Sequence, residues 1–205
     1  MTEVLDTYLT IEHSANGELK EKGSRFIAIL YPVNTPEQAM EIVSNVRKEY
    51  YDATHHCFAY IIGKEKNIFR QNDDGEPSYT AGKPIYNALL SKDLTNVLCV
   101  VVRYFGGVKL GVGGLIKAYR SAADLAIENA QIIQKQVLCC YKVSFSYEKM
   151  NDVMRILKNF SLKPLNNSFS QSCNLDFEIR KSLVKDVLSK FDMVEGVKID
   201  FIAEK

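Results

Sequence analysis

Residues 96–129 have the sequence NVLCVVVRYFGGVKLGVGGLIKAYRSAADLAIEN. The run from Val97 to Val102 is β-branched and apolar, as expected of a strand that is buried on both faces. From Leu115 onward, apolar residues recur at the three- and four-residue spacing of an amphipathic helix, with charged residues on the other face. Five glycines lie between these two segments: Gly106, Gly107, Gly111, Gly113 and Gly114. The stretch therefore predicts a strand, a glycine-rich loop and a helix.

A strand, loop and helix in this order can form an anion site. The free N–H groups and the positive dipole end at a helix start favour phosphate or carboxylate. Four basic side chains would add charge around the loop: Arg103, Lys109, Lys117 and Arg120. Two known phosphate motifs fail, because Val112 and Gly113 occupy the Walker Lys and Ser/Thr positions and Ile116 replaces the third glycine of the dinucleotide fingerprint. The competing interpretation is that the glycines only permit tight helix–strand packing.

A polar, acidic segment at residues 72–77 is explained by no hydrophobic pattern. Its acids lack the oxygen-ligand spacing of an EF-hand, so a capped turn is favoured over a metal site. Thr80 is expected to cap a helix that contains Pro84, Ile85 and Leu89. We expect one cleft to be lined by acids and bases from this segment and the glycine loop: Asp73, Asp74, Glu76, Lys83, Arg103 and Lys109.

The His and Cys residues of segment 53–60 suggest no catalytic or metal chemistry. His55 and Cys57 point to one face of a predicted strand and His56 to the other, and two potential ligands do not make a zinc site. Neighbours on one strand also cannot face each other as a nucleophile and its base. The chain has no GxSxG or HExxH motif. The sequence therefore predicts no catalytic residue, no metal and no cofactor, with histidines that find ordinary hydrogen bonds.

The N-terminal part predicts strands at 7–11, 17–20, 24–31 and 55–62. The first three would form a meander, with turns at 15–17 and at Lys22-Gly23. A helix is predicted from Pro36 to about Tyr50, with Thr35 as its N-cap.

The pattern restarts after a polar helix end expected at residues 131–136. A strand from Val137 to Tyr147 is followed by a helix at 150–160, strands at 163–170 and 173–180, a helix at 183–191 and a strand at 197–201. This βαββαβ order is that of a ferredoxin-like unit. We therefore predict two domains, at residues 1–133 and 134–205.

Composition excludes several classes of protein. A net charge of +1 provides no global basic field, so any nucleic-acid binding must be local. No apolar run reaches the roughly 20 residues of a membrane helix. The N-terminal MTEVLDTYLT is no secretory signal, which favours a cytoplasmic location without a membrane anchor. The five cysteines are predicted to be reduced and mostly buried, with Cys173 the most exposed.

Four ordered motifs resemble the IMPACT family and its bacterial YigZ-type members: SRFIA at 24–28, ATHHCFAY at 53–60, DDGEPSYTAGKPI at 73–85 and RYFGGVKLGVGGLIKAYR at 103–120. The chain departs from the family at Tyr79, where glycine is usual, and tyrosine would be strained there if φ is positive. The resemblance implies an α+β protein. A two-layer α/β sandwich like domain 2 of ribosomal protein S5 would be followed by a ferredoxin-like domain similar to the last domain of elongation factor G.

The resemblance also implies a function. We expect a non-catalytic, translation-associated regulatory protein that binds RNA or a ribosome-associated protein through the glycine loop and its basic rim. Eukaryotic members restrain a stress kinase by competing for its activator, but they carry an additional RWD domain, so that mechanism is not expected here. Two alternatives stay open: an enzyme acting on a phosphorylated small molecule, since sugar kinases share the S5-like fold, and a pure protein-interaction module. The sequence specifies no oligomeric state.

Overall fold

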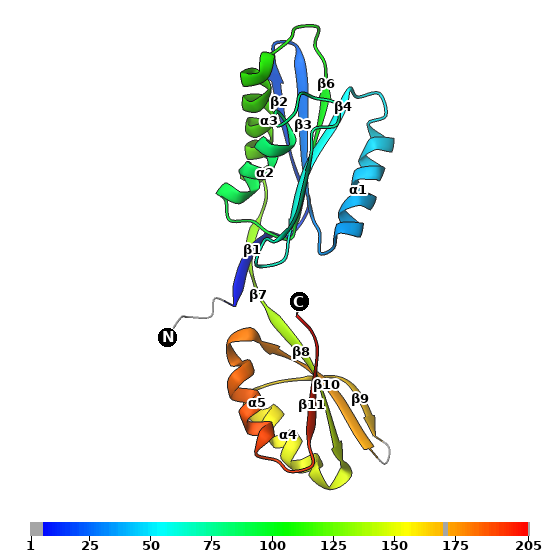
Figure 1. Ribbon diagram of the computed structural model, residues 1–205, viewed down its shortest axis with the longest axis vertical. Coiled ribbons are helices and arrows are strands. Elements are labelled where there is room, and N and C mark those ends of the chain that lie inside the picture. The colour runs from blue at the N-terminus through cyan, green and yellow to red at the C-terminus, as the bar shows by residue number, and fades with distance from the viewer. Residues whose placement is uncertain (1–5, 170–171, 205) are drawn as a thin grey trace. The chain divides into compact units, whose positions relative to one another are not determined.

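The computed structural model describes residues 6–169 and 172–204, which divide into two compact units (Figure 1). One unit comprises residues 8–135, and the other comprises the chain from Gln136 onward together with Asp6 and Thr7. Each has its own hydrophobic core. None of the helices in the described ranges has the length and apolar character needed to cross a membrane.

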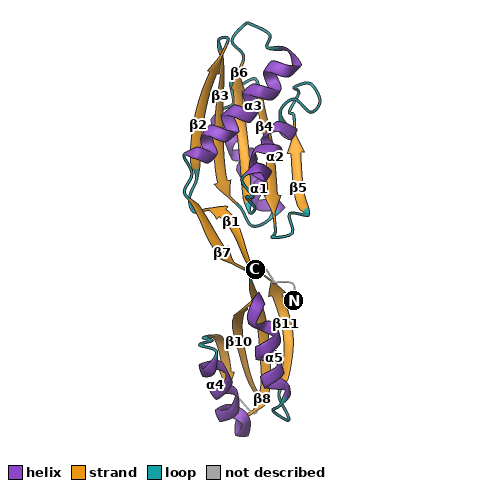
Figure 2. Cartoon of the chain, turned by 90° about the vertical axis from the view of Figure 1, so that its left-hand side faces the viewer, coloured by secondary structure: helices purple, strands orange, loops and turns teal. Residues whose placement is uncertain are grey.

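The first unit is built on a five-stranded sheet of order β2-β3-β6-β4-β5 in which every neighbouring pair is antiparallel. The strands are β2 (Ala15–Glu21), β3 (Ser24–Pro32), β4 (His55–Ile62), β5 (Ile68–Asn72) and β6 (Val97–Tyr104). The helices are α1 (Pro36–Glu49), α2 (Gly82–Ser91) and α3 (Gly111–Glu128). Figure 2 shows the sheet from the side that carries α2 and α3.

Helices cover both faces of this sheet. Alternate residues of the central β6, Val97, Cys99 and Val101, join the core beneath α2 and α3. Leu98, Val100 and Val102 join a separate core that includes Val43 and Val46 of α1. The α+β class is confirmed. The sheet lies between two layers of helices, which makes three layers, whereas the resemblance implied two layers in total. A strand that is apolar on both sides requires cover on both faces, which is why β6 has the continuous apolar run seen in the sequence.

Several local predictions are confirmed. The side chain of Thr35 accepts a hydrogen bond from the amide of Gln38 at 3.2 Å, with Pro36 at the helix start. Lys22 and Gly23 both have positive φ between β2 and β3, as a two-residue hairpin turn requires.

Other expectations were wrong. Strand β1 (Thr7–Ile11) pairs with β7 (Ile132–Gln136) and not with β2, so the three-strand meander does not form. The polar helix end expected at 131–136 is that strand, since Ile132 and Ile133 favour an extended backbone. The turn expected at 15–17 lies inside β2. Gly17 has a packing role there, because a Cβ would lie 2.5 Å from the amide nitrogen of Ala126 in α3.

The second unit has the order β8 (Leu138–Ser146), α4 (Met150–Asn159), β9 (Pro164–Phe169), β10 (Ser172–Arg180), α5 (Val184–Asp192) and β11 (Lys198–Glu204). Its sheet order is β11-β8-β10-β9 with antiparallel neighbours, which is the predicted ferredoxin-like topology. Val143, Leu175 and Phe177 share its core with Val153 and Val187 from the two helices. Ser170, the predicted end of β9, lies outside the described residues.

All five cysteines are free and buried, as predicted for a reduced protein. Cys173 was expected to be the most exposed, but it faces the core of the second unit. Its position on β10 has the same parity as Leu175 and Phe177, which explains its burial.

Candidate functional site

The glycine loop connects the end of β6 to α3, and the helix begins at Gly111, four residues before the predicted Leu115. Gly113 and Gly114 therefore belong to its first turn. No side chain caps this helix start, and its first turn contains no acidic residue. The amides of the first turn lack intrahelical acceptors, and neither a capping side chain nor an acidic residue of the first turn balances the positive end of α3.

The loop glycines have two different roles. A Cβ on Gly106 would lie 1.8 Å from the carbonyl carbon of Gly23, so this glycine permits close backbone packing. Gly107 and Gly111 have φ of +84° and +71°, and a Cβ on either, or on Gly113, would meet nothing within 4 Å. The packing interpretation thus holds at Gly106, while the part of the loop beyond it is open.

Asp73 holds the start of α2. Its Oδ1 accepts hydrogen bonds from the amides of Ala81 at 2.9 Å and Gly82 at 2.8 Å, and its Oδ2 accepts one from Tyr79 at 2.8 Å. The expected cap was wrong, because the hydroxyl of Thr80 donates to the carbonyl of Pro77 at 2.6 Å and caps nothing. A carboxylate nine residues before the first residue of the helix satisfies these donors better than one hydroxyl, since it accepts several hydrogen bonds at once.

Asp74 ties the acidic segment to the sheet. Its Oδ2 accepts the amide of His56 at 2.7 Å, and its Oδ1 pairs with the guanidinium of Arg47 in α1. His55 Nδ1 lies 2.8 Å from the carbonyl oxygen of Asp74, and His56 Nε2 lies 2.9 Å from that of Tyr50. Both histidines therefore find the ordinary hydrogen bonds that were predicted.

Glu76 and Arg103 form a buried ion pair, with Arg103 Nη1 2.5 Å from Glu76 Oε1. The same oxygen accepts the hydroxyl of Tyr119 at 2.7 Å. The guanidinium of Arg103 lies 5.3 Å from the ring centroid of Phe26 and 5.5 Å from that of Phe105, and its Nε finds no hydrogen-bond partner among the described residues. Arg103 is thus buried and held in place by its neighbours. It is not the exposed phosphate contact that the sequence predicted.

Two further side chains complete this buried cluster. Cys57 Sγ donates to the carbonyl of Asp73 at 3.0 Å and lies 3.4 Å from the hydroxyl of Tyr119. Burial raises the pKa of the Cys57 thiol and the pKa of the Tyr119 hydroxyl well above their ordinary values, so both remain protonated at neutral pH. The contact between Tyr119 and Glu76 could not be predicted from the sequence, because Tyr119 occupies an apolar position of the helical pattern.

The predicted cleft is only partly formed. Glu76, Arg103 and Lys109 line one pocket of about 380 Å³, together with apolar residues that include Phe105 and Val112. Asp73 and Asp74 do not line it. Lys83 lines a second pocket between α2 and α3, and the structure therefore separates the residues that were expected to share one cleft.

Lysines around the loop have no ionic partner. Lys22, Lys83, Lys109 and Lys117 are exposed. None of the four makes an ion pair within residues 6–169 and 172–204. We call these four residues the lysine rim.

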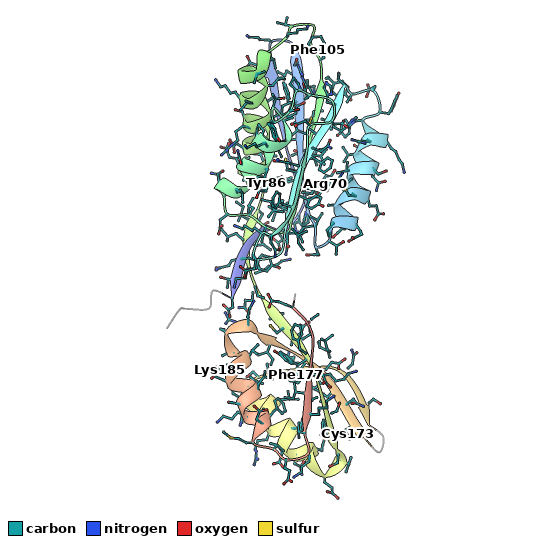
Figure 3. All side chains as sticks on the ribbon, viewed as in Figure 1. Arg70, Tyr86, Phe105, Cys173, Phe177 and Lys185 are labelled. Carbon is teal, nitrogen blue, oxygen red and sulfur yellow. The ribbon has the colours of Figure 1, made fainter. Side chains whose placement is uncertain are left out.

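Two basic residues in or near this rim, Arg120 and Lys22, differ from what was predicted. Arg120 was predicted to contact a ligand, but its guanidinium already has two partners in the protein. It forms an ion pair with Asp124 at 3.0 Å and donates a hydrogen bond to the hydroxyl of Ser91 at 2.8 Å. Lys22 was not predicted to belong to the site. It lies there because the β2–β3 turn, which contains Lys22, lines one small pocket together with Lys117. Figure 3 labels Phe105 at the end of the unit where β6 passes into the glycine loop.

A metal site is not formed by the described side chains, since no three His, Cys, Asp or Glu residues among them come together. The acidic segment instead directs its oxygens to backbone amides and basic side chains.

Fold and site define an α+β protein whose N-terminal unit presents an uncapped helix start beside unpaired lysines. Residues 22–127 match the model of the Impact N-terminal domain, and the chain belongs to the IMPACT family. It is 35% identical over 177 residues to IMPACT family member YvyE of Bacillus subtilis, covering 85% of this chain and 80% of that protein.

Other comparisons agree. The chain is 35% identical over 150 residues to IMPACT family member YigZ of Escherichia coli, covering 72% of this chain and 74% of that protein. A crystal structure described as that of a hypothetical protein superimposes with a TM-score of 0.75 at 30% identity, covering 98% of this chain and all of that one.

Proposed function

We propose that this protein is a non-catalytic, translation-associated regulator that binds RNA, or a ribosome-linked partner, at the glycine-loop end of its first unit. The proposal concerns phosphate contacts that position the protein on RNA without reading base sequence. The contacts would be made by the lysine rim and by the backbone amides at the start of α3.

One observation carries the proposal. Three exposed lysines, Lys22, Lys109 and Lys117, line pockets at a helix start that has neither a side-chain cap nor an acidic first turn, and Lys83 lines the next pocket along the same helix. None of the four pairs with a carboxylate among the described residues. Unbalanced positive charge and free N–H groups at one place favour phosphate. Because the overall charge is only +1, binding of nucleic acid would depend on a local concentration of positive charge of this kind.

The buried polar cluster supports a binding role over an enzymatic one. A nucleophile must be activated by a base or by a lowered pKa. Burial instead raises the pKa of Cys57, and Glu76 is already engaged by Arg103 and Tyr119. The Walker lysine and hydroxyl are also missing from the glycine loop.

A second candidate function, a protein-interaction module, is favoured by exposed apolar side chains at the same end. Phe105, Val108 and Val112 are 47%, 52% and 59% exposed. Exposed apolar side chains that gather beside a pocket are typical of protein-binding surfaces.

Binding to ribosomal particles and to structured RNA, measured by co-sedimentation and filter retention at several salt concentrations, tests the proposal. If about three phosphates are neutralised, the logarithm of the affinity falls with the logarithm of salt at a slope of roughly −2 to −3. No association at low salt would overturn RNA binding. Capture of ribosomal particles that survives both nuclease and high salt would favour the protein-interaction module.

A further inference from the structure

Tyr79 is an exposed aromatic residue in a backbone conformation that disfavours it. Its φ is +65°, in the left-handed region that costs energy for any residue with a Cβ. Its side chain is 64% exposed, so burial of the ring does little to offset that cost. Strained residues of this kind concentrate at functional sites.

The backbone that carries the ring is held by hydrogen bonds. The amide of Tyr79 donates to Asp73, which also holds the amides of Ala81 and Gly82 at the start of α2. Lys83 Nζ lies over the ring, 5.5 Å from its centroid. The exposed ring is thus attached to a backbone that Asp73 holds in place, and it lies beside Lys83 of the lysine rim.

The ring forms one wall of a pocket of about 370 Å³ between α2 and α3. Pro84 and Ile116 provide apolar lining, Asn87 provides an exposed side-chain amide, and Lys83 and Arg120 provide positive charge. Arg120 is oriented by Asp124 and Ser91, while Lys83 makes no ion pair among the described residues. The aromatic face of Tyr79 matches the face of a nucleotide base, and the side-chain amide of Asn87 matches the polar edge of that base. The ammonium group of Lys83 matches the phosphate.

The pocket is adjacent to the glycine-loop site along α3. Val112 lines the pocket of Glu76 and Arg103, and Ile116 lines the pocket of Tyr79. These residues are four positions apart, about one helical turn, or about 6 Å along the axis. A single strand that contacts the helix start could therefore continue into the pocket of Tyr79.

We infer that Tyr79 is a stacking platform for an unpaired base of an RNA strand, with Lys83 on the adjoining phosphate. The inference rests on the proposed function and adds a preference for single-stranded over fully paired RNA. Stacking on an aromatic ring needs an exposed base face, which a continuous duplex does not offer.

The test uses the full chain and a 12-nucleotide RNA that carries one 2-aminopurine, as a single strand and as a duplex. Stacking is expected to quench the fluorescence of the single strand. Tyr79→Ala is expected to weaken single-strand affinity about 5- to 150-fold, the range of one lost base–aromatic stack. Tyr79→Phe should retain the affinity, and duplex affinity should change less than twofold.

Two further variants separate stacking from folding. Tyr79→Gly relieves the positive φ, so it should unfold at an equal or higher temperature while it loses single-strand affinity. Tyr51→Ala removes an aromatic ring that is 83% exposed in the same unit and should leave binding unchanged. Equal losses from Tyr79→Ala and Tyr51→Ala would overturn the inference.

The remaining outcomes distinguish this inference from the proposed function. Salt-sensitive duplex binding without quenching of the single strand would overturn the Tyr79 platform and leave the proposed function standing. No binding of either RNA would overturn both. Binding of 2-aminopurine riboside monophosphate as tightly as the strand would overturn the assignment to an RNA strand and identify a free nucleotide as the ligand.

Discussion

The acidic segment at 72–77 and the lysine rim beside the glycine loop at 106–114 both carry charged side chains, and the fold uses them in opposite ways. Every acid of the first segment is engaged within the protein: Asp73 by backbone amides, Asp74 by His56 and Arg47, and Glu76 by Arg103 and Tyr119. The lysines of the rim make no ion pair with any side chain in the described part of the chain. The acids therefore build the scaffold, and the lysines remain for a ligand.

This difference shows why polar residues in a loop do not by themselves identify a binding site. A buried carboxylate that accepts several hydrogen bonds is a structural element, since removing it leaves its donors unsatisfied. An exposed lysine without a partner contributes little to stability. The two regions should therefore respond differently to substitution, in stability for the acids and in binding for the lysines.

The largest expected effect is that of Glu76→Ala. It leaves the buried guanidinium of Arg103 without its carboxylate, and breaking a buried pair from one side costs about 3–5 kcal/mol. Urea denaturation of the first unit measures this free energy of unfolding. Glu18→Ala is the matched control, because Glu18 pairs with Arg25 on the surface, where such pairs contribute little to stability. A loss below about 1 kcal/mol for Glu76→Ala would contradict its structural role.

Asp73→Ala is expected to cause the second-largest loss of stability. It removes the acceptor for the amides of Tyr79, Ala81 and Gly82, and lost charge-assisted hydrogen bonds to a helix start correspond to about 2–3 kcal/mol. Thermal unfolding measures the loss, and hydrogen exchange should show faster opening at the start of α2. Thr80→Ala is the comparison, and an equal loss there would restore Thr80 as the cap.

Gly106→Ala should destabilise the first unit by about 1–3 kcal/mol, because the new methyl group meets the backbone of Gly23. Gly113→Ala is the matched control. It adds a methyl group in open space within α3 and should be neutral or stabilising by up to about 1 kcal/mol. Equal effects of the two substitutions would show that the loop glycines do not divide into packing and open positions.

Much of the fold could be predicted from local pattern. Thr35 and Pro36 mark a helix start on their own, and the alternation through Leu175 and Phe177 marks a strand with one buried face. The pairing of β1 with β7 could not be predicted, because it joins segments more than 100 residues apart and depends on backbone hydrogen bonds that carry no residue signature.

The candidate site was predictable only in part. The family motifs brought Glu76 and Arg103 to attention, and the structure brings them into contact. Their burial could not be predicted, because it depends on Phe26, Phe105 and Tyr119 from three different elements. Lys22 was missed because its proximity to Lys117 follows from the packing of β2 against α3.

The most direct test of the account compares two pairs of charge reversals. Lys109→Glu with Lys117→Glu changes the lysine rim, and Lys185→Glu with Lys190→Glu changes exposed lysines of α5 in the second unit. Both pairs should alter the free energy of unfolding by no more than about 0.5 kcal/mol. The measurement is the salt dependence of binding to structured RNA. The account predicts that the rim variant flattens the slope by about 2 while the α5 variant keeps it; an unchanged slope in the rim variant, or equal losses in both, would contradict it.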